Sequence, residues 1–157
     1  MAKLRSGSII LFIISLPLLI GIVFYGPFVA DLFLHRRPPS RFLIPSGYVG
    51  WVTVEYDVPN AQPLLRQGKY LVVRLEKNAT ARTSSTLPDG WSHDQFFYDS
   101  GNVQQPLSNA GWCKGGMIWG EITSNEKSVK VQKFFVGKED QFRMEVDPAG
   151  KTYSPCG

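Results

Sequence analysis

A short polar cluster within the sequence LPDGWSHDQFFY holds the side chains best suited to acid–base chemistry. Asp89, His93 and Asp94 lie close together in this run, and a carboxylate that orients an imidazole can make a general base. However, Asp89 belongs to a Pro-Asp-Gly turn, where an Asp side chain usually bonds to nearby backbone. No serine or cysteine stands in the context of a nucleophile elbow. We therefore predict no catalytic site, and keep a small hydrolase-like enzyme using His93 with Asp89 or Asp94 as the alternative function.

The same weak polar cluster is a poor candidate for a metal site. Two carboxylates and one histidine leave a bound ion short of ligands, because no further His, Cys, Asp or Glu follows at a recognisable spacing. The two cysteines show no Cys/His spacing typical of zinc. The sequence therefore predicts neither a metal nor a cofactor.

Cys113 and Cys156 are the two cysteines of the chain. In an exported protein they form a candidate disulfide, which would stabilise the fold by about 4 kcal/mol according to the loop-entropy model. Two free thiols in a reduced protein, or a redox role for a reactive thiol, are the alternatives.

Aromatic side chains are numerous for a small domain. Trp91 and Trp112 lie in turn-rich segments and are the candidate partner-binding aromatics, because exposed tryptophans can form a patch for a protein, glycan or peptide. The inner faces of a β-sandwich also need large side chains. We therefore expect Trp51, Trp119 and the pair Phe96-Phe97 to pack in the core.

Residues 42–157 show the patterns of a single β-rich domain. The run YVGWVTVEY alternates, with Tyr48, Val52, Val54 and Tyr56 on one face, and KYLVVRLEK repeats the alternation. Further β-branched and aromatic runs, separated by Gly, Pro, Asp and Asn turns, are QFFY, MIWGEIT and VKVQKFFV. This spacing predicts an antiparallel β-sandwich or a small barrel. The run KEDQFRMEV could be a strand, but acids in its first turn favour one short C-terminal helix.

An uncharged apolar segment, residues 9–30, precedes this domain. As a helix it would span about 33 Å, enough to cross a hydrocarbon core of about 30 Å. We therefore expect a single N-terminal transmembrane helix between a short cytoplasmic tail, residues 1–8, and a juxtamembrane spacer, residues 31–41. A cleaved signal peptide stays open as the alternative, although bulky Phe28 precedes Ala30 where a cut site favours small residues.

The net charge of +4 lies outside the β domain. Residues 1–41 carry the whole excess, and residues 42–157 hold equal numbers of basic and acidic residues. A nucleic-acid binder needs a basic patch on its folded domain to neutralise phosphates. The charge pattern therefore argues against nucleic acid as a partner, and favours membrane lipid contacting residues 9–30.

Several short motifs resemble those of an uncharacterised bacterial family of exported or membrane-anchored β domains. They are the IPxGYxGWV opening at Ile44, the RTSSxLPxGW run from Arg82 to Trp91, the turn from Phe96 to Gly101, and IWGE followed by FFVG between Ile118 and Gly137. The resemblance implies a cell-membrane protein with its β domain outside the cytoplasm, and implies no activity. We therefore expect a binding or assembly module of the bacterial envelope, with an unknown envelope protein or glycan as its partner.

Overall fold

The computed structural model describes residues 23–25, 36–87, 89–109, 111, 113–126 and 129–149. The chain divides into two compact units: unit 1 comprises Met1–Arg37 with Asp89–Trp91, and unit 2 comprises Pro38–Pro88 with Ser92–Gly157. All of the strands and the helix named below belong to unit 2.

The predicted anchor, residues 9–30, lies outside the described residues except for Val23–Tyr25, which are helical. Among the residues that are described, no helix has the length and apolar character that crossing a bilayer requires. The division of the chain into tail, anchor, spacer and domain therefore stays a prediction.

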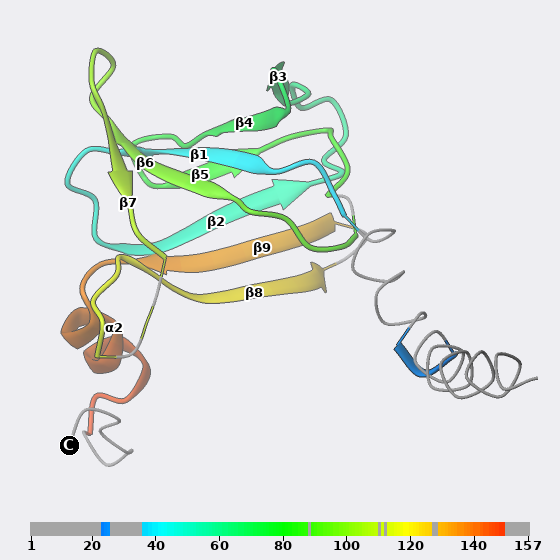
Figure 1. Cartoon of the computed structure of the whole chain (residues 1–157). Coiled ribbons are helices and arrows are strands. Elements are labelled where there is room, and N and C mark those ends of the chain that lie inside the picture. The colour runs from blue at the N-terminus through cyan, green and yellow to red at the C-terminus, as the bar shows by residue number, and fades with distance from the viewer. Residues whose placement is uncertain are drawn as a thin grey trace, which may run out of the picture. The chain divides into compact units, whose positions relative to one another are not determined.

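Unit 2 is built from two β-sheets that face each other (Figure 1). Sheet 1 has the strand order β3-β4-β1-β6-β7, formed by β1 (Ser40–Pro45), β3 (Leu65–Gln67), β4 (Tyr70–Arg74), β6 (Gln95–Asp99) and β7 (Gln104–Leu107). Sheet 2 has the order β5-β2-β9-β8, formed by β2 (Gly50–Tyr56), β5 (Thr80–Arg82), β8 (Ile118–Glu126) and β9 (Val129–Val136). The domain is therefore mainly β, as predicted, and its two sheets do not close into a barrel.

Both sheets are mixed, so the prediction of a purely antiparallel sandwich is wrong. Strand β1 pairs in parallel with β4 and β6, and β2 pairs in parallel with β5. The short connection after Pro45 carries the chain from sheet 1 to sheet 2 instead of closing a hairpin. Later the chain leaves sheet 1 after β4, forms β5 in sheet 2 and returns as β6, so that β4 and β6 run in the same direction on either side of β1. The opposite sheet thus supplies the crossover that parallel strands require.

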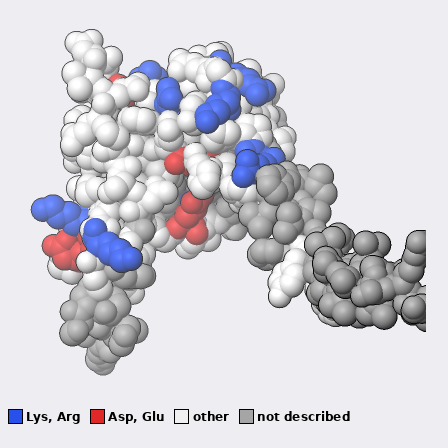
Figure 2. Space-filling view, viewed as in Figure 1, with Lys and Arg blue, Asp and Glu red and all other residues white. Residues whose placement is uncertain are grey.

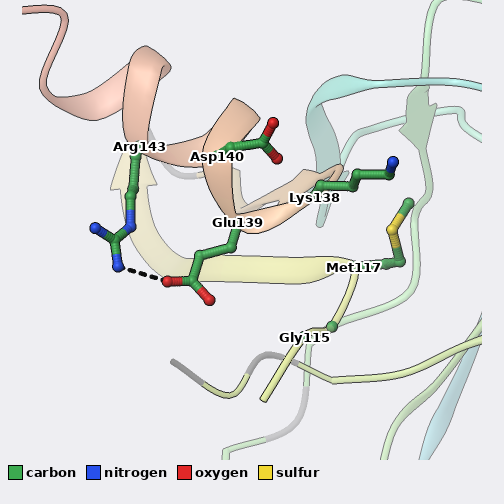
Figure 3. Close-up of a pocket in the computed structure, with 7 residues that line it drawn as sticks. Gly115, Met117, Lys138, Glu139, Asp140 and Arg143 are labelled. Atoms are coloured by element: carbon green, nitrogen blue, oxygen red, sulfur yellow. Dashed lines mark hydrogen bonds and ion pairs between the residues drawn. The ribbon is translucent and has the colours of Figure 1, made fainter. Parts of the chain in front are cut away.

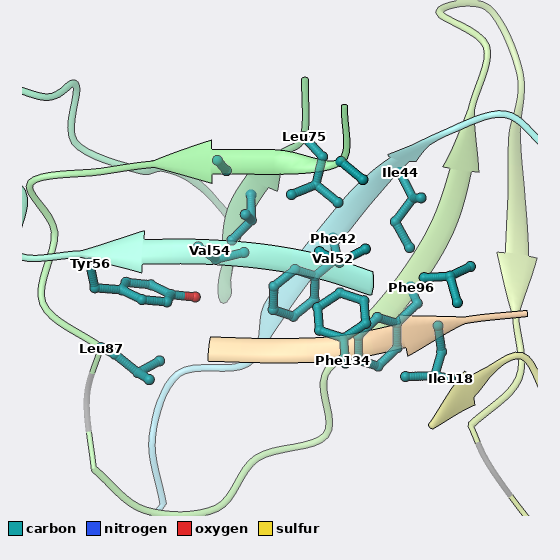
Figure 4. Packing of buried hydrophobic residues seen from close by; sticks show 14 residues of the cluster. Phe42, Ile44, Val52, Val54, Tyr56, Leu75, Leu87, Phe96, Ile118 and Phe134 are labelled. Atoms are coloured by element: carbon teal, nitrogen blue, oxygen red, sulfur yellow. The ribbon is translucent and has the colours of Figure 1, made fainter. Parts of the chain in front are cut away.

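The hydrophobic core lies between the two sheets (Figure 4). Phe42 of β1 and Phe96 of β6 are stacked with their ring centroids 5.0 Å apart. Phe134 of β9 meets each ring edge-on at 5.1 Å. The predicted alternation in β2 is confirmed, because Val52, Val54 and Tyr56 are all buried in this core.

The run KEDQFRMEV forms a helix, α2 (Glu139–Val146), as its acidic first turn indicated. The backbone N–H of Lys138 donates to Oε1 of Gln141 at 2.8 Å, which satisfies a donor at the start of the helix. Phe142 is the buried residue of this helix. The face of α2 that carries Phe142 therefore packs against a sheet.

Replacing Phe134 with alanine should lower the free energy of unfolding by about 3–5 kcal/mol, because it leaves a cavity where three rings meet. The matched control is Ile122→Ala on β8, whose side chain is 55% exposed and should contribute little. Denaturant unfolding followed by tryptophan fluorescence measures both changes. Equal losses for the two variants would contradict the packing.

Candidate functional site

The three residues of the predicted polar cluster are divided between the two units. Asp89 belongs to unit 1, whereas His93 and Asp94 belong to unit 2. Oδ1 of Asp94 accepts hydrogen bonds from the backbone N–H of Ser40 at 2.7 Å and from the hydroxyl of Ser92 at 2.5 Å. These bonds fix the start of β1 beside β6. They give Asp94 a structural role, and His93 is exposed.

Trp91 is half-buried in unit 1 and contacts the residues that precede unit 2. The guanidinium carbon of Arg36 lies 4.5 Å from the centroid of the Trp91 ring. The backbone N–H of Arg37 donates to the Trp91 carbonyl at 3.1 Å. Both contacts hold the spacer against this tryptophan, so one face of the ring is already covered by a cation.

Trp112 and Cys156 lie outside the described residues, so the predicted aromatic pair and the candidate disulfide stay predictions. Cys113 is described, and its backbone N–H donates to Oε2 of Glu139 at 2.9 Å. Cys113 has a φ of +62°, in the left-handed region that non-glycine residues seldom adopt. This loop position is therefore held directly against the first turn of α2.

A second aromatic cluster, on the outer face of sheet 2, forms the surface on which α2 packs. Trp119 of β8 and Phe135 of β9 pack with Phe142 of the helix, and Trp51 of β2 lies beside them. The Trp119 and Phe142 rings are stacked at 5.8 Å. Nε1 of Trp51 donates to Oε1 of Glu145 at 3.2 Å. Trp51 and Trp119 are thus packed as expected, but under the helix rather than between the sheets.

Gly120 allows the helix to approach β8 closely. It has a φ of +59°, and a Cβ placed there would lie 3.0 Å from Cζ of Phe142. The pairing of β8 with β9 shifts between Trp119 and Ile122, which marks a bulge at this position. The bulge and the missing side chain together make room for the Phe142 ring.

A shallow groove of about 670 Å³ lies between the start of α2 and the loop before β8 (Figure 3). Its lining residues are Gly115, Gly116, Met117, Lys138, Glu139, Asp140 and Arg143. Figure 3 shows Met117 and Lys138 on one side, and Glu139 and Arg143 on the other. We take this groove as the candidate functional site.

Glu139 is held by two hydrogen bonds at one side of the groove. Its Oε1 accepts from Nη2 of Arg143 at 2.6 Å, and its Oε2 accepts from the backbone N–H of Cys113. The hydrogen bond from Arg143, followed by the one from Cys113, lowers the pKa of Glu139 below its ordinary value of 4.5. Both oxygens of the Glu139 carboxylate are therefore engaged, one by Arg143 and the other by the loop at Cys113.

The groove offers more to a binding partner than to a reaction. Apart from its one paired carboxylate and one paired arginine, it exposes a methionine, two glycines and the side chains of Lys138 and Asp140. Within the described ranges, no group of three or more His, Cys, Asp and Glu residues is placed to hold a metal ion.

Sequence reasoning missed this groove. The acids of the first helical turn and the Gly-Gly pair before MIWGEIT were both recognised as local features. They are more than twenty positions apart in the chain, and they are brought together by the packing of Phe142 on Trp119 and by the hydrogen bond from Cys113 to Glu139. The signal that could have found the site is the run of three charged residues, Lys138, Glu139 and Asp140, shortly before Phe142.

A model described as "Family of unknown function (DUF6843)" matches residues 36–145, so the chain belongs to this family. A comparison with curated proteins found no significant match. Among solved structures, the fold is similar to a crystal structure of a protein described as "Putative Lipoprotein from Bacillus anthracis". The TM-score is 0.50 at 20% identity, and the match covers 63% of this chain and 69% of the other.

Replacing Gly120 with alanine should weaken the packing of α2 on sheet 2. The left-handed backbone alone costs a side chain about 1–2 kcal/mol, and the new Cβ would also press on Phe142. Unfolding measured by denaturant should show a loss of this size or larger. Gly68→Ala, at a φ of +60° with open space around its Cβ, is the control for strain without the clash. A loss at Gly120 no larger than that at Gly68 would contradict the close approach.

The attachment of α2 should weaken in acid. Because the pKa of folded Glu139 lies below its unfolded value near 4.5, its stabilising effect is complete above that pH and is lost as the pH falls through the lowered value. Fluorescence of Trp51 and Trp119 between pH 7 and pH 3 should show this change, and Glu139→Gln should remove it. Asp140→Asn, one residue further along the same turn, should retain it. An identical acid response in both variants would refute this role for Glu139.

Proposed function

We propose that this protein is a membrane-anchored binding module of the bacterial envelope, whose groove beside α2 receives a segment of a partner polypeptide. The groove carries this proposal, because it is open, offers Met117 and two glycines beside charged side chains, and its Glu139 carboxylate already accepts two hydrogen bonds. Such a surface can bind without needing a reactive group.

The chemistry of the groove favours a polypeptide over a glycan. None of its described lining residues is aromatic, whereas a sugar ring packs best on an aromatic face. Gly115 and Gly116 have no side chains, so the backbone of a partner could approach them closely. Met117 can adapt its shape to an apolar side chain, and Lys138 and Asp140 could fix the register through opposite charges.

The envelope location is supported by the sequence and by the description of the similar crystal structure. Residues 9–30 are uncharged and long enough to span a bilayer, and the similar crystal structure is of a protein described as a lipoprotein. The segment 9–30 contains no cysteine to carry a lipid. We therefore place the anchor in the polypeptide itself, with the β domain outside the cytoplasm.

The hydrolase-like alternative gains no support from the groove. His93 is not among its lining residues, and the Asp94 carboxylate is engaged by Ser40 and Ser92. An enzyme would need a nucleophile or an activated water beside His93. We therefore favour binding.

A photo-crosslinking residue at Asp140, in the full chain in living cells, tests the groove directly. It should yield a discrete adduct with one envelope protein, identified by mass spectrometry, and Met117→Glu should reduce that adduct by about tenfold, since it places a charge in an apolar contact. The same crosslinker at Lys77, an exposed position far along the chain from the groove, is the control. Identical adducts from both positions, or no effect of Met117→Glu, would contradict the proposal.

A further inference from the structure

The chain enters unit 2 beside the turn between β3 and β4. The first residue of β1, Ser40, is the Cα partner of Leu71 in β4, and the backbone N–H of Leu71 donates to the Pro39 carbonyl at 2.9 Å. The turn at Gly68–Lys69 directly precedes β4. In Figure 1 the chain reaches β1 from the side on which β3 lies.

This end of sheet 1 is basic. Arg41 in β1, Arg66 in β3 and Lys69 in the turn between β3 and β4 all belong to this end of the sheet, and residues 58–75 contain no acidic residue. Within the described part of the chain these three cations form no ion pair. Figure 2 shows blue side chains gathered along the part of the molecule formed by β3 and β4.

The opposite end of the same sheet is neutralised. Arg74, at the last residue of β4, is paired with Asp99 at the last residue of β6. Asp94 lies at the basic end and accepts hydrogen bonds from Ser40 and Ser92, but Arg41, Arg66 and Lys69 outnumber this one acid. The uncompensated positive charge of sheet 1 is therefore concentrated at the end where the chain enters.

Aromatic and apolar side chains accompany these cations. The guanidinium carbon of Arg41 lies 4.6 Å from the Tyr70 ring centroid and 5.6 Å from that of Phe97. Nζ of Lys69 lies 5.3 Å from the Tyr70 ring. Leu65, the first residue of β3, is 72% exposed. Surfaces that bind at a lipid interface typically combine cations with a tyrosine and exposed apolar side chains, as this one does.

The guanidinium of Arg41 is only partly engaged at this surface. Its Nη2 donates to Oε1 of Gln95 at 3.3 Å, and its Nε is buried, so an anionic oxygen would have to bind at its terminal Nη atoms. The flanking rings hold the planar group in one orientation. A pre-oriented guanidinium of this kind suits an anionic oxygen, such as that of a phosphate.

The predicted anchor places this end close to the bilayer. Unit 2 begins at Pro38, and the apolar segment ends at Ala30. Even a fully extended connection could span no more than about 28 Å at 3.5 Å per residue. A short tether keeps the local concentration of the membrane surface high, and anionic lipid attracts basic residues within about a Debye length, roughly 10 Å.

We propose that Arg41, Arg66 and Lys69, with Tyr70 and Leu65, form a surface that binds anionic lipid headgroups and so docks the basic end of sheet 1 on the membrane. This inference rests on the membrane anchor of the proposed function. It adds that the β domain, which carries the groove beside α2, has a fixed orientation relative to the bilayer.

Hydrogen exchange of the full chain in lipid nanodiscs tests this docking. One set of discs contains phosphatidylcholine alone, and the other contains phosphatidylglycerol in addition. Exchange of the peptide covering residues 64–72 should be at least about fivefold slower in the anionic discs, since each cation near an anionic surface strengthens attraction about fivefold. High salt should remove the difference. A peptide covering the β4–β5 turn, at the neutralised end, should exchange equally in both.

Charge reversal identifies the residues responsible. Arg66→Glu with Lys69→Glu should abolish the lipid-dependent slowing, whereas Lys77→Glu in the β4–β5 turn should leave it intact. Both side chains in the double variant are exposed, and an unchanged unfolding midpoint confirms its fold. Lys69→Glu alone should give a partial loss.

The outcomes separate the two proposals. The docking surface is overturned, while the anchor stands, if residues 64–72 exchange equally in the two kinds of disc. It is also overturned if the slowing in anionic discs survives the double charge reversal. Failure of the wild-type chain to remain with the discs in either lipid overturns the anchor and with it the proposed function.

Discussion

The contact on which the rest of the structure depends is the meeting of Phe134 with Phe42 and Phe96. One ring from sheet 2 stands edge-on to a stacked pair from sheet 1, and all three are almost fully buried. Burial of such rings contributes roughly 1.5–3 kcal/mol each, and aromatic pairs favour the stacked and edge-on geometries seen here. This contact holds the two sheets at one separation and one register.

The outer faces of the sheets acquire different properties because the inner faces share one core. On sheet 2, a bulge in β8 and the absence of a side chain at Gly120 admit the Phe142 ring, so a short helix with one buried residue can be held in place. The groove is a consequence of that docking. On sheet 1, the cations collect at the end where the chain enters, beside Tyr70 and Leu65.

Periodicity in the sequence was sufficient to predict what is local. The alternation of Val52, Val54 and Tyr56 identified both the strand and its buried face, because side chains of a strand point to opposite sides in turn. The acids before Phe142 identified the helix, because negative charge favours a helix N-terminus. These features depend on near neighbours in the chain.

The arrangement of the strands was not predictable in the same way. Nothing in the residues after Pro45 distinguishes a connection that closes a hairpin from one that crosses to the opposite sheet, and nothing local indicates that β4 and β6 pair in parallel with β1. The position of Trp119 shows the same limit. Its size indicated burial, but whether it lies between the sheets or under a helix depends on Phe142, far along the chain.

The candidate site was predicted less well than the fold. The side chains chosen for their chemistry, Asp89, His93 and Asp94, are split between two units, and the Asp94 carboxylate is used to fix the start of β1. The groove instead uses Glu139, whose partner at Cys113 is a backbone N–H. Sequence patterns carry no signal for a bond of this kind, because every residue except proline has that donor.

The central claim is that the sandwich is a module tethered to a membrane and exposed outside the cytoplasm. Protease added to intact spheroplasts that carry the full chain tests it most directly, with the membranes afterwards washed in alkaline carbonate. The account predicts that residues of the β domain are digested, while a short fragment containing residues 9–30 stays with the washed membrane. Recovery of the intact chain in the soluble fraction, or full protection of the domain from protease, would contradict it.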